Sequence, residues 1–540
     1  MRSNPLILRG IAIAAVALLI CASSVSSISG HVGRISSISE DTVEQKPFLD
    51  IPPDEEWNVT FGGSLRDVGM SVEQTTDGGY IITGVKDFNY YDESNIWLIK
   101  TDDRGNKEWD KTFGSKGHDS GHSVQQTSEG GYIIAGRTWS YGSGDYDVWL
   151  VKTDGDGNEM WNKTFGGINM DTGDSVLLTT QEGYTIVGYT ESYDIGGGDV
   201  WLIKTDIDGN EKWNKTFGGA KGDFGNAIQQ TNDAGYIITG CTESFGSGYF
   251  DVWLVKTDGD GNEMWNKTFG GPERDYGFEV LQTTDGGYVI AGTKSYGAGE
   301  DIWLIKTDGD GNEMWNKTFG GNDDDLAYSV RQTNDERYII TGYTYSYAPG
   351  YASDLWLIKT DSYGNKLWDK TFGSSSGSKG DEGHAVQQSH DGGYIVVGTT
   401  QSYGSGDYDV WLIKVAPFEN QRPSVEFVNP REGYFHFSGI PLFPTALNLI
   451  ADNASFGGFR LKPIQVNATD ENSKPGELMV TLFINGEDKG YGIWNPDTGF
   501  YEWKWTGWAL GTYNLRVKAK DMYGGEGWAS MDVWNFYFIP

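Results

Sequence analysis

The sequence has little cysteine, little positive charge and only one long hydrophobic run. Among 540 residues only Cys21 and Cys241 are cysteines, so removal of an N-terminal segment that contains Cys21 would leave no intramolecular disulfide. The 41 Lys and Arg residues stand against 76 Asp and Glu residues, which gives a net charge of −35. This charge repels nucleic-acid phosphates and anionic lipids, so neither is an expected partner. The chain must be stable through packing alone.

The single hydrophobic run, Ile11–Ala22, is 12 residues long and too short to cross a bilayer comfortably. It follows two arginines and precedes a small, polar stretch, which is the order of a secretory signal. We therefore predict a signal peptide over 1–29, a linker over 30–53, and a mature protein that is secreted or displayed on the cell surface. Two alternatives stay open: an uncleaved anchor starting near Leu6 and a lipoprotein attached at Cys21.

Helical periodicity is missing between residues 54 and 416, where one pattern is repeated instead. Each copy contains two tryptophans, and the second recurs at steps of 52, 52, 52, 52, 50 and 53 residues. Such a period is typical of stacked or circular repeats. The first tryptophan of the pattern is Trp97, Trp149, Trp201, Trp253, Trp303, Trp356 and Trp411, and the second is Trp57, Trp109, Trp161, Trp213, Trp265, Trp315 and Trp368.

Each copy contains four short segments with the composition of β-strands. In the second copy they are Ser123–Thr127, Tyr132–Ala135, Asp147–Lys152 and Glu159–Phe165, here called a, b, c and d. They are rich in β-branched and aromatic residues. The a–b and c–d turns contain Gly and Asn, which supply the positive φ of tight hairpins. The repeat therefore predicts a four-stranded antiparallel meander.

The two ends of the repeat region complete each other. The seventh copy ends with its c strand, Asp409–Lys414, and has no d strand. At the other end, Glu56–Phe61 is a d strand without a, b or c before it. An open solenoid would need capping repeats of atypical sequence, and none is visible. We predict an all-β fold, a seven-bladed β-propeller over 54–416 that is closed by its N-terminal strand.

The repeat also resembles known propeller families. The pattern Leu-Val-Lys-Thr-Asp…Gly-Asn…Trp is similar to quinoprotein-like blades, and Asp-x-x-Gly-x-x-x-Trp is similar to the Asp-box hairpins of sialidase-like propellers. Over residues 55–415 the whole repeat resembles secreted archaeal and bacterial surface proteins with tandem propeller repeats. The resemblance implies the fold, but neither quinoprotein cofactor ligands nor a sialidase arginine triad can be located. The arginines of the repeat region occupy unrelated repeat positions: Arg66, Arg104, Arg137, Arg274, Arg331 and Arg337.

The composition changes after residue 420, and alternating segments such as Ile464–Asp470, Leu478–Gly486 and Tyr513–Asp521 follow. This pattern predicts a β-sandwich over 421–540. The segment resembles the Ig-like modules of surface proteins, although the cysteine pair of antibody-type domains is absent. The resemblance implies a spacer or an adhesive unit.

The b–c loops vary most between the seven copies, and binding commonly lies on variable loops of a fixed scaffold. In a meander these loops and the d–a connections share one face of the ring. Aromatic side chains of the b–c loops could stack on a sugar or a protein surface. The predicted ligand-binding face comprises Tyr91, Trp139, Tyr141, Tyr193, Phe245, Tyr296, Tyr347 and Tyr403.

An aspartate recurs in every d–a connection. One interpretation is an acidic ring at the rim of the central channel that attracts a cation or sugar hydroxyls. The other is that each carboxylate caps its own turn by accepting from backbone N–H groups. The seven residues are Asp67, Asp119, Asp171, Asp223, Asp275, Asp325 and Asp381.

Other motifs carry weaker signals. The c–d turn Asp154–Asn158 is similar to a calcium loop but lacks the bidentate Glu at the twelfth position. His122 and His384 share a repeat position in different blades, which makes a two-His metal site a weak candidate. We expect no cofactor and no bound metal, with calcium as the alternative. Asn-x-Ser/Thr sequons predict N-glycosylation, with the alternative that Asn and Thr of the d strands only form the polar face of an edge strand. The sequons begin at Asn58, Asn162, Asn214, Asn266, Asn316, Asn453 and Asn467.

Two classes of function remain. The first is a non-catalytic extracellular or cell-surface binding and adhesion protein, expected to be monomeric, whose partner is a glycan or an extracellular protein. The second is a secreted carbohydrate-active or quinone-dependent enzyme on the same scaffold. We favour binding because no Gly-x-Ser-x-Gly elbow, zinc motif or phosphate loop is present, and the copies differ mainly in loop length.

Overall fold

The computed structural model describes residues 52–417, with gaps at 89–92, 180–182, 194–195, 297–298 and 375–378, and segments between 424 and 536. All secondary structure in these residues is β. The chain divides into two compact units, of which one is Lys46–Glu419 and the other contains Asn420–Pro540. Across the described residues no helix has the length and apolar character needed to cross a membrane.

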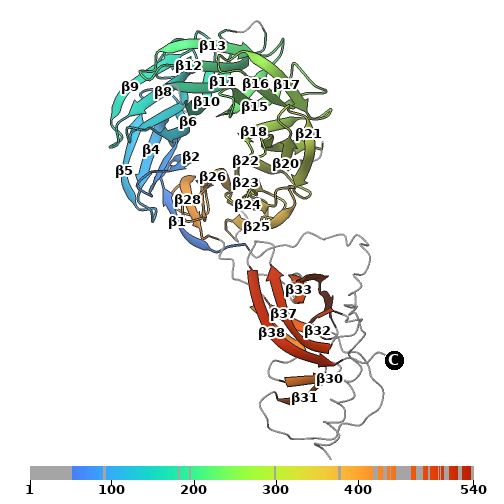
Figure 1. Ribbon diagram of the computed structural model, residues 1–540. Helices are drawn as coiled ribbons and strands as arrows, with labels where there is room; N and C mark the ends of the chain where they lie inside the picture. Colours follow the sequence, from blue (N-terminus) through green and yellow to red (C-terminus); the bar gives the residue numbers. More distant parts are fainter. Residues whose placement is uncertain are drawn as a thin grey trace, which may run out of the picture. The chain divides into compact units, whose positions relative to one another are not determined.

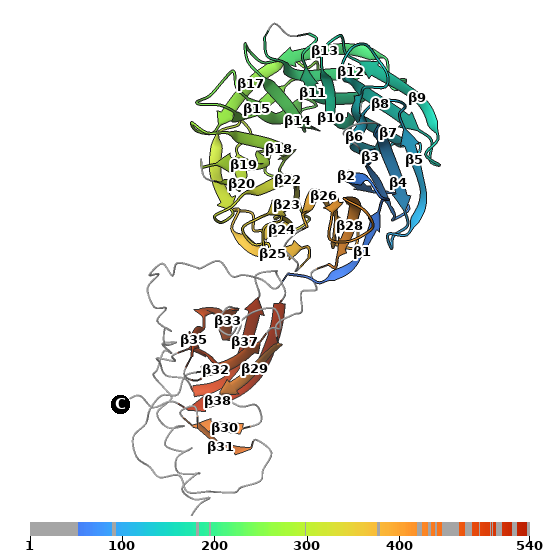
Figure 2. The same cartoon turned by 180° about the vertical axis from the view of Figure 1, so that it is seen from behind.

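The unit Lys46–Glu419 contains, among its described residues, seven four-stranded antiparallel sheets of the kind that form propeller blades. They are arranged around a centre, with β2, β6, β10, β14, β18, β22 and β26 as the inner strands (Figures 1 and 2). The first blade is β2 (Arg66–Gln74), β3 (Tyr80–Phe88), β4 (Asn95–Thr101) and β5 (Lys107–Phe113); the second is β6 (Asp119–Gln126), β7 (Tyr132–Thr138), β8 (Asp147–Thr153) and β9 (Glu159–Phe165). The third is β10 (Asp171–Leu178), β11 (Tyr184–Thr190), β12 (Asp199–Thr205) and β13 (Glu211–Phe217); the fourth is β14 (Asp223–Gln230), β15 (Tyr236–Thr242), β16 (Asp251–Thr257) and β17 (Glu263–Phe269). The fifth is β18 (Asp275–Gln282), β19 (Tyr288–Ser295), β20 (Glu300–Thr307) and β21 (Glu313–Phe319); the sixth is β22 (Asp325–Gln332), β23 (Tyr338–Thr344), β24 (Asp354–Thr360) and β25 (Lys366–Phe372).

The seventh blade combines the two ends of the repeat region. It consists of β26 (Asp381–Gln388), β27 (Tyr394–Thr400), β28 (Asp409–Val415) and, as its outer strand, β1 (Glu55–Phe61). β1 is antiparallel to β28, with Phe61 opposite Val410. The N-terminal d strand therefore pairs with the last c strand, as the sequence predicts.

The predicted c and d strands agree with the observed ones to within one residue. In the second blade the b strand ends at Thr138, three residues after the predicted Ala135, and the a strand differs more. In the second blade this strand starts at Asp119, four residues earlier than Ser123, and has a bulge between Gly121 and Ser123. Gly121 lies opposite Gly136, and a Cβ on Gly136 would lie 1.9 Å from the carbonyl oxygen of Ser120. The two strands approach so closely that only glycine fits. The bulge breaks the alternation of side chains, and hides the start of the strand from a pattern analysis.

The hydrophobic core lies between neighbouring blades. Trp149 of the second blade is 1% exposed and belongs to a cluster that also contains Ile81 and Leu98 of the first blade. The first and seventh blades share such a cluster too, in which Val72 and Trp97 meet Val410. Each blade therefore buries its faces against its neighbours. Cys241, the cysteine in the part of the chain that the structure describes, is free and buried.

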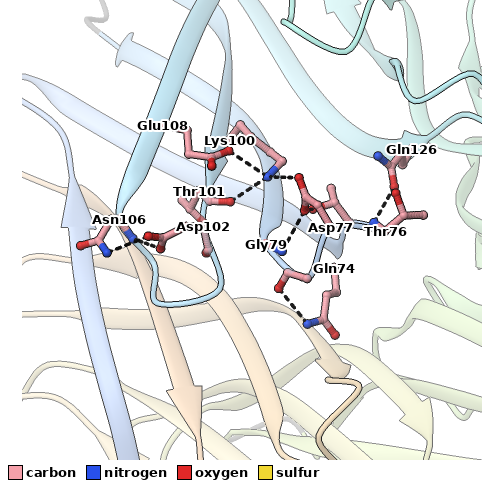
Figure 3. A network of polar contacts seen from close by, with 12 residues as sticks. Gln74, Thr76, Asp77, Gly79, Lys100, Thr101, Asp102, Asn106, Glu108 and Gln126 are labelled. Atoms are coloured by element: carbon pink, nitrogen blue, oxygen red, sulfur yellow. Dashed lines mark hydrogen bonds and ion pairs between the residues drawn. The ribbon is translucent and has the colours of Figure 1, made fainter.

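Most c-strand lysines form ion pairs within their blades, whereas Lys204 donates to the hydroxyls of Thr179 and Thr185. Lys100 is buried, and its Nζ lies 3.0 Å from an oxygen of Asp77 and 3.1 Å from Glu108, both in the first blade (Figure 3). These ion pairs lie within the blade because its own a–b turn supplies Asp77 and its own outer strand supplies Glu108. Neighbouring blades are also joined by hydrogen bonds of side-chain amides, since Thr76 N–H of the first blade donates to Gln126 Oε1 of the second at 2.9 Å.

In the second unit, the described segments form two sheets. One contains β29 (Ser424–Asn429), β32 (Ile464–Thr469), β36 (Phe500–Trp503) and β35 (Ile493–Asn495); the other contains β31 (Ile440–Pro444), β30 (Tyr434–Phe437), β38 (Glu526–Phe536), β37 (Leu510–Lys520), β33 (Met479–Ile484) and β34 (Glu487–Tyr491). Val466 and Trp503 of the first sheet share a buried cluster with Leu482 and Val517 of the second. Two sheets around one core are the arrangement expected of a sandwich.

Candidate functional site

A cavity of about 200 Å³ lies between the inner strands of the first and second blades. The residues Arg66, Val68 and Met70 line it from the first blade, and His118, Ser120 and His122 line it from the second. In each trio every second residue of the chain reaches the cavity. The remaining lining residues are Val85, Phe88, Ser94, Asp119, Arg137 and Tyr146.

Two arginines make this cavity positive in an otherwise acidic protein. The guanidinium of Arg66 lies over the ring of Tyr408, 4.5 Å from its centroid, and that of Arg137 lies over Tyr146 at 4.6 Å. The Nε atoms of both arginines are buried and have no hydrogen-bond partner among the described residues. A buried N–H without a partner is costly. Both groups are therefore positioned to gain an acceptor from a ligand.

Aromatic rings continue the wall of the cavity toward its rim. The centroids of Phe88 and His118 are 5.7 Å apart, those of His118 and Trp139 are 6.1 Å apart, and those of Trp139 and Tyr146 are 5.3 Å apart. Trp139 is 51% exposed. Such surfaces suit the apolar faces of sugar rings.

Ser120, His122 and Asp174 form a hydrogen-bonded chain at the cavity. Ser120 Oγ lies 2.9 Å from His122 Nε2, and His122 Nδ1 lies 2.9 Å from Asp174 Oδ1. The other oxygen of Asp174 accepts from the hydroxyl of Thr172 at 2.9 Å. Ser120 and His122 belong to β6, whereas Asp174 belongs to β10 of the third blade.

The predicted acidic ring has another role in this structure. All seven aspartates are buried, with 0 or 1% of their surface exposed. Asp119 accepts from Ser115 N–H at 3.2 Å and from the hydroxyls of Thr138 and Ser140, both at 2.5 Å. Corresponding bonds form in the other blades: Gly63 to Asp67, Gly167 to Asp171, Gly219 to Asp223, Gly271 to Asp275, Gly321 to Asp325, and Thr400 to Asp381. These are the bonds of turn caps, the second of the two interpretations, and buried carboxylates with local donors do not form an exposed acidic rim.

A second set of aspartates, at the start of the c strands, lies beside the capping set. Asp147 and Asp409 are buried, and Oδ1 of each has no hydrogen-bond partner among the described residues. Burial, with the nearby charge of Asp171, raises the pKa of Asp147. Burial likewise raises the pKa of Asp409. In the sixth blade, burial and the charge of Asp381 raise the pKa of Asp354 to about 6.

Most of the predicted aromatic ligand residues pack on their own blade. Tyr141 lies against Trp149 with centroids 5.2 Å apart, and its hydroxyl donates to Gly114 O at 3.4 Å. The same packing joins Tyr193 to Trp201, Phe245 to Trp253, Tyr347 to Trp356, and Tyr403 to Trp411. Tyr296 is exposed near Lys294, and Tyr91 lies outside the described residues. Among the members of the predicted set that the structure describes, Trp139 contacts rings of the cavity wall, those of His118 and Tyr146.

The sequon asparagines of the d strands support the core tryptophans. Asn162 Oδ1 accepts from the indole N–H of Trp149 at 3.2 Å. In the first blade Asp110 accepts the corresponding bond from Trp97 at 2.9 Å, so the bond does not require asparagine. Equivalent bonds reach Asn58, Asn214, Asn266 and Asn316. Asn467 is half-buried in β32, and Asn453 lies outside the described residues. Glycosylation stays a prediction.

The predicted metal motifs are engaged in protein contacts. Asp154 Oδ1 accepts from Asp156 N–H at 3.0 Å and from Asn158 N–H at 2.8 Å. Figure 3 shows the same turn in the first blade, where Asp102 accepts from Asn106. The described part of the chain has no group of three or more His, Cys, Asp or Glu side chains placed to hold a metal ion.

The signal that would have found the cavity is variation at inner-strand positions. The residue before each capping aspartate is Arg66, His118, Met170, Gly222, Arg274, Asp324 or Gly380, and the residue three after it is Met70, His122, Asp174, Asn226, Phe278, Tyr328 or His384. The neighbouring glycines and tryptophans barely change. The positions that vary without a change in length therefore mark the specialised surface.

Comparison with known proteins adds little to the description of the site. No family model and no curated protein matches the chain. The extracellular domain of a proposed one-component system of B. thetaiotaomicron is 11% identical with a TM-score of 0.37, covering 91% of this chain and 60% of that one. The polysaccharide lyase Uly1 is 10% identical with a TM-score of 0.40, covering 71% of this chain and 94% of that one. At these identities and scores the likeness carries no functional argument.

Proposed function

We propose that this is a secreted or cell-surface protein that binds an acidic glycan in the cavity between the first and second blades. The observation that carries the proposal is the pair of stacked arginines, Arg66 and Arg137, whose buried Nε atoms have no partner among the described residues. A carboxylate is the acceptor that a guanidinium binds best, often through two hydrogen bonds.

The aromatic rings explain why the carboxylate should belong to a sugar. Phe88, Trp139 and Tyr146 extend from the arginines to the surface, so they could stack on sugar rings while the acid group is held inside. The N-terminal sequence supports export, and an acidic polysaccharide is an anion that an exported protein encounters. The net charge of −35 disfavours non-specific polyanion binding, so recognition must come from this local positive site.

The scaffold that we propose is a closed seven-bladed propeller followed by an Ig-like module. Pairing of β1 with β28 and the cluster shared by the first and seventh blades support closure. The shared core of the two C-terminal sheets supports a sandwich. We infer that the module acts as a spacer and that the protein is a monomer.

The test is isothermal titration with sodium polygalacturonate, using dextran as the neutral polymer. We expect binding of polygalacturonate alone, and a loss of affinity of at least about tenfold in Arg66→Ala and in Arg137→Ala. Arg104→Ala is the matched control, because Arg104 lies in an exposed c–d turn and should not affect binding. Equal binding of dextran, or unchanged affinity in both cavity variants, would contradict the proposal.

A further inference from the structure

We infer that the same cavity hydrolyses esters of its acidic sugar ligand, with Ser120 as nucleophile, His122 as general base and Asp174 as positioning residue. This inference rests on the proposed function for its substrate class. The observation behind the hydrolysis is independent of the arginines. It consists of the two contacts of 2.9 Å that join the serine hydroxyl, the imidazole and the carboxylate.

The partners of His122 determine its tautomer. Asp174 can only accept when ionised, so Nδ1 must carry the proton that it shares with Asp174. In the neutral ring Nε2 is then the acceptor, and it faces the hydroxyl of Ser120. This is the arrangement in which an imidazole removes a proton from a serine. Asp174 itself is fixed by the second hydrogen bond from Thr172.

The repeat shows that the fold does not require this chain of contacts. The seventh blade has a histidine at the same position, His384, but its Nδ1 lies 2.7 Å from the backbone oxygen of Gly69. Its other nitrogen lies 3.4 Å from Glu382, which occupies the position of Ser120. In the first blade, which neighbours the seventh, Met70 occupies the repeat position that Asp174 has in the third blade. Histidine alone is therefore compatible with the strand, and only the second blade adds a hydroxyl and a carboxylate.

The cavity also contains donors for the charge that would develop on a substrate. Arg137 lies opposite Ser120 in the pairing of β6 with β7, and we assign its guanidinium to the oxyanion. Arg66, from the neighbouring blade, binds the sugar carboxylate together with Arg137, whose other N–H groups are available to the oxyanion. Ser120 lines the cavity, so a ligand held by the arginines has access to its hydroxyl.

The reaction proceeds in two balanced steps. Ser120 Oγ bonds to the ester carbonyl carbon as its proton passes to His122 Nε2, then the bond to the sugar oxygen breaks and that oxygen takes the proton. A water molecule, deprotonated by the same Nε2, attacks the acyl carbon and releases the carboxylic acid while Ser120 regains its proton. No oxidant or cofactor is needed.

The first measurement is acetate release from O-acetylated polygalacturonate by the full-length protein. Ser120→Ala and His122→Gln should each lower the rate at least about a hundredfold. Asp174→Asn should lower kcat about as strongly, with KM within about twofold and a changed pH profile, because the imidazole loses its orienting partner. His384→Gln is the matched control and should retain the rate within about twofold.

The second measurement uses diisopropyl fluorophosphate, whose phosphorus is attacked by an activated serine with loss of fluoride. Mass spectrometry should find the phosphoryl group on Ser120 in the unaltered protein and in His384→Gln, and not in His122→Gln. Absence of both labelling and acetate release, or a rate unaffected by Ser120→Ala, would overturn the inference. Ser120→Ala should still bind polygalacturonate although it no longer hydrolyses the ester. In the unaltered protein, binding of polygalacturonate without hydrolysis rejects this inference alone, whereas hydrolysis of acetyl esters without binding of polygalacturonate rejects the acidic glycan.

Discussion

The second and seventh blades contain the same core but different inner strands. Trp149 and Trp411 are both 1% exposed and both donate to an asparagine of the outer strand. At the inner strand, however, the second blade has Ser120 and His122, whereas the seventh has Glu382 and His384. Structural constraints have kept the outer three strands alike, while the strand that lines the centre is free to differ. Function should therefore be sought at inner positions.

The blades also differ in how the chain builds them. The second blade is continuous from Asp119 to Phe165, whereas the outer strand of the seventh comes from the other end of the repeat region. Removing that outer strand should therefore affect the seventh blade and not the second, and it is the change for which we expect the largest effect. Deleting residues 54–62 would remove β1 and with it the contacts of Trp57, Val59 and Phe61 with the seventh blade's core.

We expect this deletion to lower the melting temperature by about 10 °C or more, since several large apolar side chains lose their burial. Near-ultraviolet circular dichroism of the full chain would measure it. A deletion of equal length within the linker, residues 34–42, is the control and should leave the transition in place. Identical melting of the two deletions would show that β1 does not stabilise the seventh blade.

The common core predicts equal losses in the two blades. Trp149→Ala and Trp411→Ala should each lower the free energy of unfolding by about 3–5 kcal/mol, as expected for large buried aromatic residues. Urea unfolding would measure both. Trp139→Ala, at a 51% exposed position, should change stability by less than about 1 kcal/mol. A stable Trp149→Ala variant that lost only ligand binding would assign this tryptophan to recognition instead.

The buried aspartates predict a pH dependence in both blades. Because burial raises the folded-state pKa of Asp147 and of Asp409, the folded protein binds their protons more tightly than the unfolded chain. The stability linked to these protons is present below the unfolded pKa and is lost as the pH rises through the folded pKa. Asn cannot ionise, so Asp147→Asn and Asp409→Asn should melt roughly 2–4 °C higher than the parent at pH 8.

Melting curves from pH 4 to pH 8 would test this prediction. The advantage of both variants should shrink toward pH 4, where the parent's carboxyls are protonated as well. Asp145→Asn, in an exposed part of the same loop as Asp147, serves as the control and should not reproduce the trend. An advantage that grew toward low pH would contradict the direction of the pKa shifts.

The smallest expected effect concerns the loop tyrosines. Tyr141→Phe and Tyr403→Phe would each remove one hydroxyl bond to a glycine carbonyl, of 3.4 and 3.1 Å. The loss of stability should be about 1 kcal/mol or less, and Phe245 occupies this position in the fourth blade without a hydroxyl. Polygalacturonate affinity should stay unchanged in both variants. Weaker polygalacturonate binding at an unchanged melting temperature would show that these tyrosines contact the ligand.

The sequence was sufficient for the architecture because the repeat encodes it seven times. The period, the turn glycines and the unpaired strand at Glu56–Phe61 predict the blades and the pairing of β1 with β28. The candidate site was harder to predict because the contacts of Asp174 with His122 cross from one blade to the next, 52 residues along the chain. A spacing pattern within one copy cannot show such a contact. The sequence analysis assigned ligand binding to the aromatic residues of the b–c loops, yet residues such as Tyr141 mainly pack on a core tryptophan of their own blade.

The pairing of β1 with β28 also has a consequence in time. Glu55 leaves the site of synthesis first, and its partner Val415 follows 360 residues later. At roughly 5–20 residues per second this delay is about 20–70 s. Until β28 has been synthesised, β1 has no strand to pair with. Its polar side chains, among them Glu55, Glu56 and Asn58, disfavour pairing with a strand of another chain. The polar side chains of β1 therefore act against aggregation before β28 has been made.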